Sequence, residues 1–185
     1  MCGVLPRPLP RLEERHLMTT PLLHTPPRGG GDSAATDSEV AAIIALARAR
    51  GANTVILGSG RNPGAMAAMA AVAAEWEGIG GRIAARVTWP ESAASWLRQA
   101  RRFTATTPDL WIMTGPASGW AQMTRRLLWS TTWSPRNTLV MSGTGAPATL
   151  AAVGTAHLNG LTGVDPDCST WTVSGDAKRS LRQGA

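Results

Sequence analysis

The chain has 185 residues, enough for one α/β domain with a buried core and too few for two such domains. Hydrophobic residues make up 43% of it, which excludes a mostly disordered protein. The sequence contains no run of about 18 apolar residues, so no membrane span is predicted. The net charge of +6 comes from 17 arginines and one lysine, spread over successive segments without a row of stacking aromatics, so we expect no nucleic-acid partner.

Residues 1–35 are rich in proline, arginine and glycine, and they predict a flexible N-terminal segment that ends in a hinge-like linker. The opening MCGVLPRPLPRLEERHL lacks the apolar core of a signal peptide, so the chain as written is expected in the cytoplasm. Cys2 and Cys168 are far apart and the three histidines are isolated in sequence, so neither a metal nor another cofactor is expected.

Strand-like and helix-like segments alternate along the centre of the chain. Apolar runs predict five strands, over residues 53–58, 82–88, 109–114, 137–141 and 159–164. Helices are predicted before and between them, over residues 37–50, 64–76 and 92–103, after residue 119, and over 147–154. Thr36 and Glu39 have the spacing of a capping box at the start of the first helix. Arg98, Arg101 and Arg102 share one helix face, which predicts a solvated surface, with binding to acidic surfaces as the alternative.

Strands separated by helix-length crossovers pair in parallel, with helices on both faces of the sheet. The sequence therefore predicts an α/β fold over residues 36–166: a three-layer Rossmann-like domain with a mostly parallel five-stranded sheet and the first strand at its centre. The pattern fades after Asp165, so residues 167–185 are predicted to form a loosely ordered C-terminal tail. Sheets of this kind place their ligand sites at the carboxyl ends of the strands.

The segment GSGRNPG, residues 58–64, is the best motif candidate for ligand chemistry. Its glycines allow close approach of the backbone, and a predicted helix follows at once, so free N–H groups point into the loop. A dinucleotide fingerprint needs a third glycine where Pro63 stands, and no Gly-Lys-Ser/Thr follows as in a Walker loop. The segment is therefore a weak cofactor motif, and a tight strand-to-helix turn without a ligand explains it as well.

No catalytic set can be assembled from the sequence, so the chain is predicted not to be an enzyme. Ser59 lacks the G-x-S-x-G spacing of a nucleophile elbow, and no two carboxylates pair at one strand end. Asp109 begins a strand, at the edge opposite the usual site, and is predicted to cap a turn. Trp96 and Trp120 lie on inward helix faces, which favours core packing over an aromatic cage.

The order of segments resembles the second lobe of type I periplasmic binding proteins, the branched-chain amino-acid receptor family of ABC transporters. The likeness runs from about Thr20 to Pro166 and depends on five segments. These are a Leu-His-Thr-Pro-Pro-Arg hinge at residues 23–28, GANTVIL at 51–57, GGRIAARVTWP at 80–90, PDLWI at 108–112, which follows Trp96 and Leu97, and GLTGV at 160–164. The first lobe of such receptors has no counterpart before the hinge, so the chain resembles one truncated jaw of a clamshell.

The resemblance implies a non-catalytic solute-binding lobe for branched-chain amino acids, amides or similar small solutes. It implies an ABC permease as partner if a complete receptor exists, and an extracytoplasmic location for the family. The implied ligand-facing residues follow successive strands: Ser59, Arg61, Asn62, Gly115, Ser118, Ser142 and Thr144. They are equally consistent with ordinary polar turn residues.

One alternative is a small α/β enzyme or regulator domain that binds a nucleotide or phosphorylated ligand at the turn of residues 58–64. Another is the sensor domain of a LacI-like regulator, which shares the fold. That regulator requires a helix-turn-helix, and residues 1–24 are too short and too rich in proline to form one.

Overall fold

The computed structural model describes residues 35–181, and two of its three longer helices, α1 and α2, begin at a side-chain cap. Helix α1 (Asp37–Ala49) follows Thr36, whose hydroxyl accepts a hydrogen bond from the amide of Glu39 at 3.1 Å. Helix α2 (Pro63–Gly78) follows Asn62, whose side-chain oxygen accepts from the amide three residues on, at 3.3 Å. The other helices are α3 (Leu97–Phe103), α4 (Ala117–Ser130) and α5 (Pro147–Val153), with short 3-10 turns η1 (Pro135–Asn137), η2 (Ser142–Thr144) and η3 (Thr155–Leu158).

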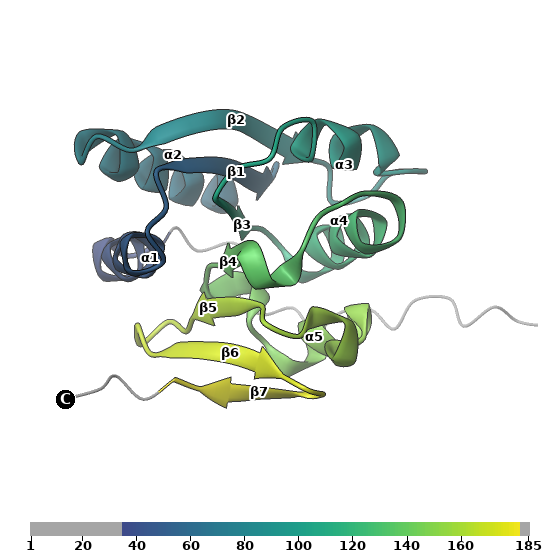
Figure 1. The fold of residues 1–185 in the computed structure, drawn as a ribbon. Helices are drawn as coiled ribbons and strands as arrows, with labels where there is room; N and C mark the ends of the chain where they lie inside the picture. The colour runs from purple at the N-terminus through teal and green to yellow at the C-terminus, as the bar shows by residue number, and fades with distance from the viewer. Residues whose placement is uncertain (1–34, 182–185) are drawn as a thin grey trace, which may run out of the picture.

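A single seven-stranded sheet runs through the described residues, in the order β2-β1-β3-β4-β5-β6-β7 (Figure 1). Its strands are β1 (Thr54–Gly60), β2 (Arg82–Trp89), β3 (Leu110–Thr114), β4 (Thr138–Val140), β5 (Thr162–Val164), β6 (Thr170–Ser174) and β7 (Ala177–Ser180). Strands β1 to β5 pair in parallel, whereas β6 and β7 are antiparallel. The predicted α/β class is confirmed. The predicted strand number is too low by two, and β1 lies beside the edge strand β2 rather than at the centre.

The additional strands form a hairpin in the segment that was expected to be a loose tail. Trp171 and Val173 alternate with more exposed residues along β6 and are buried, which is the period of a half-buried strand. The turn uses Gly175 at φ +65, a conformation that favours glycine. The expectation of a loose tail is therefore wrong over residues 170–180. The predicted flexible segment, residues 1–34, and residues 182–185 lie outside the described part of the chain.

Lys178 of β7 connects this hairpin to the parallel part of the sheet through hydrogen bonds and an ion pair. Its ammonium donates to both carboxylate oxygens of Asp165, at 2.6 and 2.8 Å, and to the carbonyl of Gly145 at 3.2 Å. The same ammonium lies 4.7 Å from the ring centroid of Trp171. The hairpin is thereby connected to the loops that follow β4 and β5.

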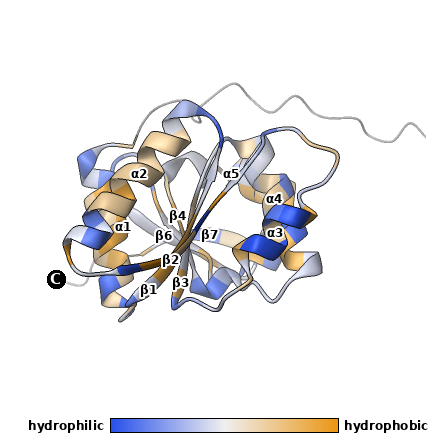
Figure 2. Ribbon diagram, turned by 90° about the horizontal axis from the view of Figure 1, so that it is seen from above, coloured by the Kyte–Doolittle hydropathy of each residue, from blue (hydrophilic) through white to orange (hydrophobic). Residues whose placement is uncertain are grey.

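Two apolar cores separate the layers, one on each face of the sheet. Helices α1 and α2 pack on one face, where Ile43 and Val72 meet residues of β1, β3 and β4. Helices α3, α4 and α5 cover the other face (Figure 2). Trp120 is buried in this second core as expected, together with Trp89. The three layers place every carboxyl end of β1 to β5 at one edge of the domain.

Asp109 lies at the opposite edge and caps the chain there, in agreement with its predicted role. Its carboxylate accepts hydrogen bonds from the amides of Asn53 and Thr54, at 2.9 and 2.8 Å. These two bonds hold the pKa of Asp109 below its usual value of 3.8, with a smaller contribution from Arg82.

We expect Asp109→Asn to lower the free energy of unfolding at pH 7 by less than about 1 kcal/mol, because the carboxylate is exposed. A depressed folded-state pKa stabilises the fold above the unfolded pKa of 3.8, and this contribution is lost as the pH falls through the folded value. Urea unfolding at pH 7 and at pH 3 should therefore show a smaller difference between variant and parent at pH 3. The exposed Asp176→Asn is the control, and a difference independent of pH would contradict the assignment.

Candidate functional site

The loops after β1, β3 and β4 meet at the carboxyl edge of the sheet, because these strands are direct neighbours. These loops, with the adjoining end of β1 and the first turn of α4, carry the seven residues that the sequence singled out: Ser59, Arg61, Asn62, Gly115, Ser118, Ser142 and Thr144. The structure brings all three loops to one edge, but it gives their residues different environments.

The turn after β1 is shorter than the sequence suggested, because β1 continues through Gly60. Ser59 is part of the strand and is only 3% exposed, so its hydroxyl is poorly accessible to a solute. Arg61 is exposed, and its side chain makes no hydrogen bond or ion pair with the described residues. Asn62 is half-buried, and its side chain caps α2.

Glu91 closes this turn from the neighbouring strand end, and the sequence analysis did not select it. Its Oε1 accepts hydrogen bonds from the amides of Arg61 at 2.9 Å and of Asn62 at 3.4 Å. Its carboxylate lies where side chains of Gly60 and Gly119 would otherwise stand. Two amides of the turn that leads into α2, which a phosphate could use, are thus occupied by a carboxylate of the chain itself.

The loop after β3 approaches the end of β1 through two glycines. Gly115 has φ +150, and a Cβ placed there would lie 3.0 Å from the amide nitrogen of Gly60. Any larger residue would push the two strand ends apart. Ser118 lies in the first turn of α4 and is exposed.

The loop after β4 is held by helix α1. The amide of Ser142 donates to Oε1 of Glu39 at 2.8 Å, and Glu39 is only 4% exposed. The predicted capping box is therefore half formed: Thr36 caps the Glu39 amide, but the Glu39 side chain reaches across to the loop. Thr144 is fully buried, and its hydroxyl donates to the carbonyl of Met141 at 2.8 Å.

Several solved structures are similar to this chain in fold. A substrate-binding periplasmic protein from Ralstonia solanacearum matches with a TM-score of 0.60 and 14% identity, over 70% of this chain and 36% of that one. A branched-chain amino-acid ABC transporter periplasmic ligand-binding protein from Burkholderia xenovorans matches with a TM-score of 0.56 and 17% identity, over 73% and 36%. A leucine-binding protein from Thermotoga maritima matches with a TM-score of 0.58 and 18% identity, over 68% and 35%.

The chain has the fold of one lobe of a type I periplasmic binding protein. This confirms the resemblance inferred from the sequence, at the level of fold. The chain spans little more than a third of the length of these solved proteins. No protein-family model matches the sequence, and no curated protein matches it significantly.

At the carboxyl edge of this lobe, four of the seven selected residues are not buried. Arg61 and Ser118 are exposed, Asn62 and Ser142 are half-buried, and the Asn62 side chain is engaged in the cap of α2, whereas Ser59, Gly115 and Thr144 are buried. Arg61, Ser118 and Ser142 come from three different segments, the turn after β1, the first turn of α4 and η2, so together they extend across the ends of β1, β3 and β4.

Neither a metal centre nor a membrane span is found in the described part. Among residues 35–181, no three His, Cys, Asp or Glu side chains come together as metal ligands. None of the helices in this range is both long enough and apolar enough to cross a membrane.

Proposed function

We propose that this chain is a non-catalytic solute-binding lobe, equivalent to the second lobe of a type I periplasmic binding protein. The observation that carries the proposal is the meeting of three polar loops at the carboxyl edge of a lobe with this fold. The solute class is an amino acid, an amide or a similar small molecule, which agrees with neighbours described as leucine-binding or branched-chain amino-acid transport proteins.

The accessible groups suit a solute that carries a carboxylate. Arg61 offers a guanidinium at the end of β1, which can hold a carboxylate through two parallel hydrogen bonds. The hydroxyls of Ser118 and Ser142 can each donate or accept one further bond. The wall of the solute site behind these three side chains is then formed by Ser59, Asn62, Gly115 and Thr144. In a complete receptor, an ABC permease would be the partner that receives the solute.

Occupation of the turn amides of Arg61 and Asn62 by Glu91 argues against the nucleotide alternative. A phosphate at this turn would have to displace a carboxylate that already accepts from Arg61 and Asn62.

Titration of the ¹⁵N-labelled chain with leucine, isoleucine, valine and their amides, followed by amide chemical shifts, tests the proposal. We expect shifts at Arg61, Ser118 and Ser142 with a dissociation constant on the order of 1 mM, because one wall supplies only part of the contacts. Arg61→Ala should abolish the shifts for the free amino acids, and the exposed Arg48→Ala is the matched control.

Three results would contradict the proposal. One is an absence of amide shifts for every solute of the panel at a concentration of roughly 20 mM, which is 20-fold the expected dissociation constant. Another is equal sensitivity to Arg61→Ala and Arg48→Ala. The third is tight binding of a nucleotide that is lost in Arg61→Ala, which would support the nucleotide alternative.

A further inference from the structure

The outer face of helices α3 and α4 carries a dense group of arginines, here called the arginine face. Its members are Arg98, Arg101, Arg102, Arg125 and Arg126, and all five are exposed. On α3 they stand at positions i, i+3 and i+4, so they share one side of the helix. The two helices pack against each other, and Figure 2 shows their hydrophilic outer sides together.

Within the described residues, no acidic side chain forms an ion pair with the arginine face. From residue 92 to residue 164 the sequence contains one carboxylate side chain, Asp109. That carboxylate is bound to the amides of Asn53 and Thr54. Among the other exposed arginines of the described residues, Arg86 pairs with Glu77 at 3.1 Å.

In the described part of the chain, Arg98, Arg101, Arg102 and Arg125 make no hydrogen bond or ion pair. Arg126 makes one long contact, 3.5 Å to the hydroxyl of Ser130. A surface whose positive charges are not neutralised by acidic side chains of the same protein favours a negatively charged partner.

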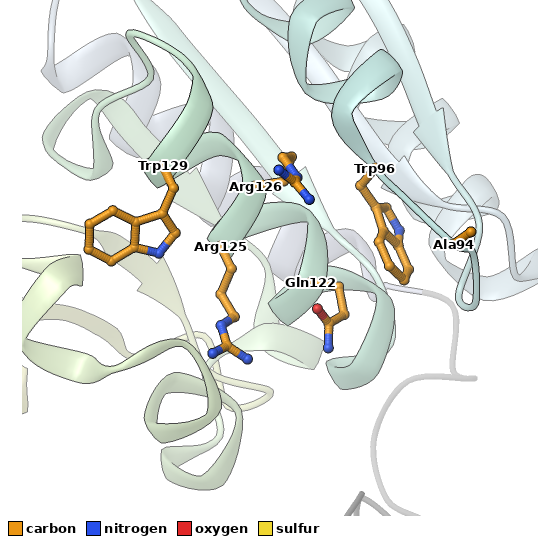
Figure 3. Close-up of a pocket in the computed structure, with 6 residues that line it drawn as sticks. All are labelled: Ala94, Trp96, Gln122, Arg125, Arg126 and Trp129. Carbon is orange, nitrogen blue, oxygen red and sulfur yellow. The ribbon is translucent and has the colours of Figure 1, made fainter. Parts of the chain in front are cut away.

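A hollow of about 300 Å³ adjoins these arginines along α4 (Figure 3). Gln122, Arg125, Arg126 and Trp129 line it at helical spacing from α4, and Ala94 and Trp96 line it from the segment before α3. The Trp96 indole is fixed, because its N–H donates to the carbonyl of Pro90 at 2.9 Å.

Trp129 is 69% exposed, the highest value among the exposed large apolar side chains of the described residues. Its ring meets the edge of the His157 ring at a centroid distance of 5.2 Å. A tryptophan and arginines around one hollow are the residue types that dominate binding energy at protein interfaces.

We propose that the arginine face and its hollow bind an acidic polypeptide segment, one that places a single apolar side chain in the hollow between flanking carboxylates. The carboxylates pair with the guanidiniums, which match their planar geometry. A second copy of this chain is a poor occupant, because two arginine faces would repel each other. A single-stranded nucleic acid is disfavoured, because it needs a row of stacking platforms and this face exposes one tryptophan.

The test uses the full chain and a fluorescein-labelled probe peptide, Glu-Asp-Glu-Leu-Glu-Asp-Glu, with a control peptide in which Gln and Asn replace the acids. Fluorescence anisotropy should show saturable binding of the acidic probe only, weakened about tenfold or more by Arg125→Gln with Arg126→Gln. The charge-matched control is Arg48→Gln with Arg179→Gln, two exposed arginines on α1 and β7. It should weaken binding by no more than about twofold. Trp129→Ser should weaken binding without altering net charge.

Some outcomes would overturn the proposal. Equal weakening by the two arginine pairs would show that net charge alone attracts the probe. An unchanged affinity in Trp129→Ser would remove the hollow from the site. Binding of a ten-residue oligothymidylate at least about tenfold more tightly than the peptide, with the same sensitivity to the variants, would assign the face to nucleic acid. If the acidic probe does not bind even in low salt, the proposal is rejected.

Discussion

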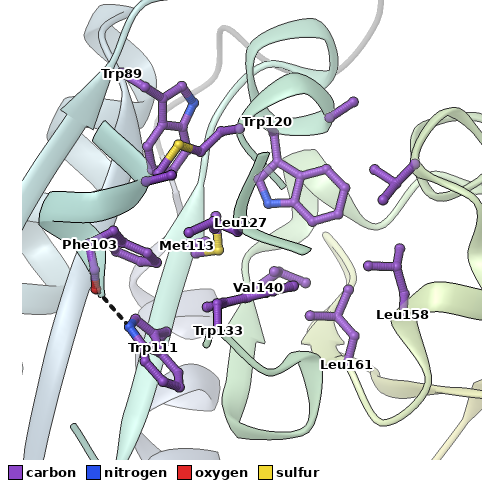
Figure 4. Packing of buried hydrophobic residues seen from close by; sticks show 14 of the residues in the cluster. Trp89, Phe103, Trp111, Met113, Trp120, Leu127, Trp133, Val140, Leu158 and Leu161 are labelled. Carbon is purple, nitrogen blue, oxygen red and sulfur yellow. Dashed lines mark hydrogen bonds between the residues drawn. The ribbon is translucent and has the colours of Figure 1, made fainter. Parts of the chain in front are cut away.

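Gly58→Ala should destabilise the fold by about 2–3 kcal/mol, although it adds only one methyl group. A Cβ at this position would lie 2.6 Å from Cε2 of Phe103 and 2.7 Å from Cζ3 of Trp89. Both rings are fully buried and already pack edge to face, with centroids 6.3 Å apart (Figure 4). Neither ring can move away without disturbing the second core, where the Trp111 indole donates to the carbonyl of Phe103 at 3.0 Å.

Gly78→Ala is the matched control for this substitution. Gly78 ends α2, and nothing lies within 4 Å of a Cβ built there. Alanine should therefore be neutral or stabilise by up to about 1 kcal/mol, since it favours the helix. Urea unfolding of both variants provides the comparison. If Gly58→Ala unfolds like the parent, the first glycine of the segment at residues 58–64 is not required for packing, and a ligand becomes the better explanation for it.

Glu91→Ala is the second substitution with a large expected effect, a loss of about 2 kcal/mol in the free energy of unfolding. It removes the acceptor of the Arg61 and Asn62 amides and leaves a gap between Gly60 and Gly119. Glu91→Gln keeps an acceptor oxygen of the same size and should lose less than Glu91→Ala.

Glu75→Ala controls for the loss of a carboxylate, because Glu75 is exposed on α2 and should change stability by no more than about 0.5 kcal/mol. Thermal or urea unfolding at neutral pH measures all three variants. An equal effect of Glu75→Ala and Glu91→Ala would show that the contact of Glu91 with the turn contributes nothing specific.

The glycines at residues 58–64 show how a sequence motif can have two physical causes. The pattern was interpreted as close approach of the backbone to a ligand, with a tight turn without a ligand as the alternative, and in the structure the close neighbours are groups of the chain itself. The groups are the rings of Phe103 and Trp89 at Gly58 and the Glu91 carboxylate at Gly60. Sequence spacing could not distinguish these internal neighbours from a ligand, because both require the same absence of a side chain.

The α/β class and the edge that holds the candidate site could be predicted from the sequence. Hydrophobic periodicity reports which residues are buried within each element, and helix-length crossovers require parallel strands. These are local properties, so the five parallel strands were all predicted, as was the helix start at Thr36. The meeting of the loops after β1, β3 and β4 followed from the general rule for such sheets.

Only the tertiary structure decided the contacts between elements. The strand order placed β1 beside the edge and brought Glu91 to a turn 30 residues earlier in the chain, while Glu39 reached Ser142 across 103 residues. In the tertiary structure β6 also pairs with β5, so the backbone N–H and C=O groups of this C-terminal strand find hydrogen-bond partners in the sheet. Backbone hydrogen bonds and carboxylate contacts between distant residues depend on which elements become neighbours, and local periodicity carries no information about that choice.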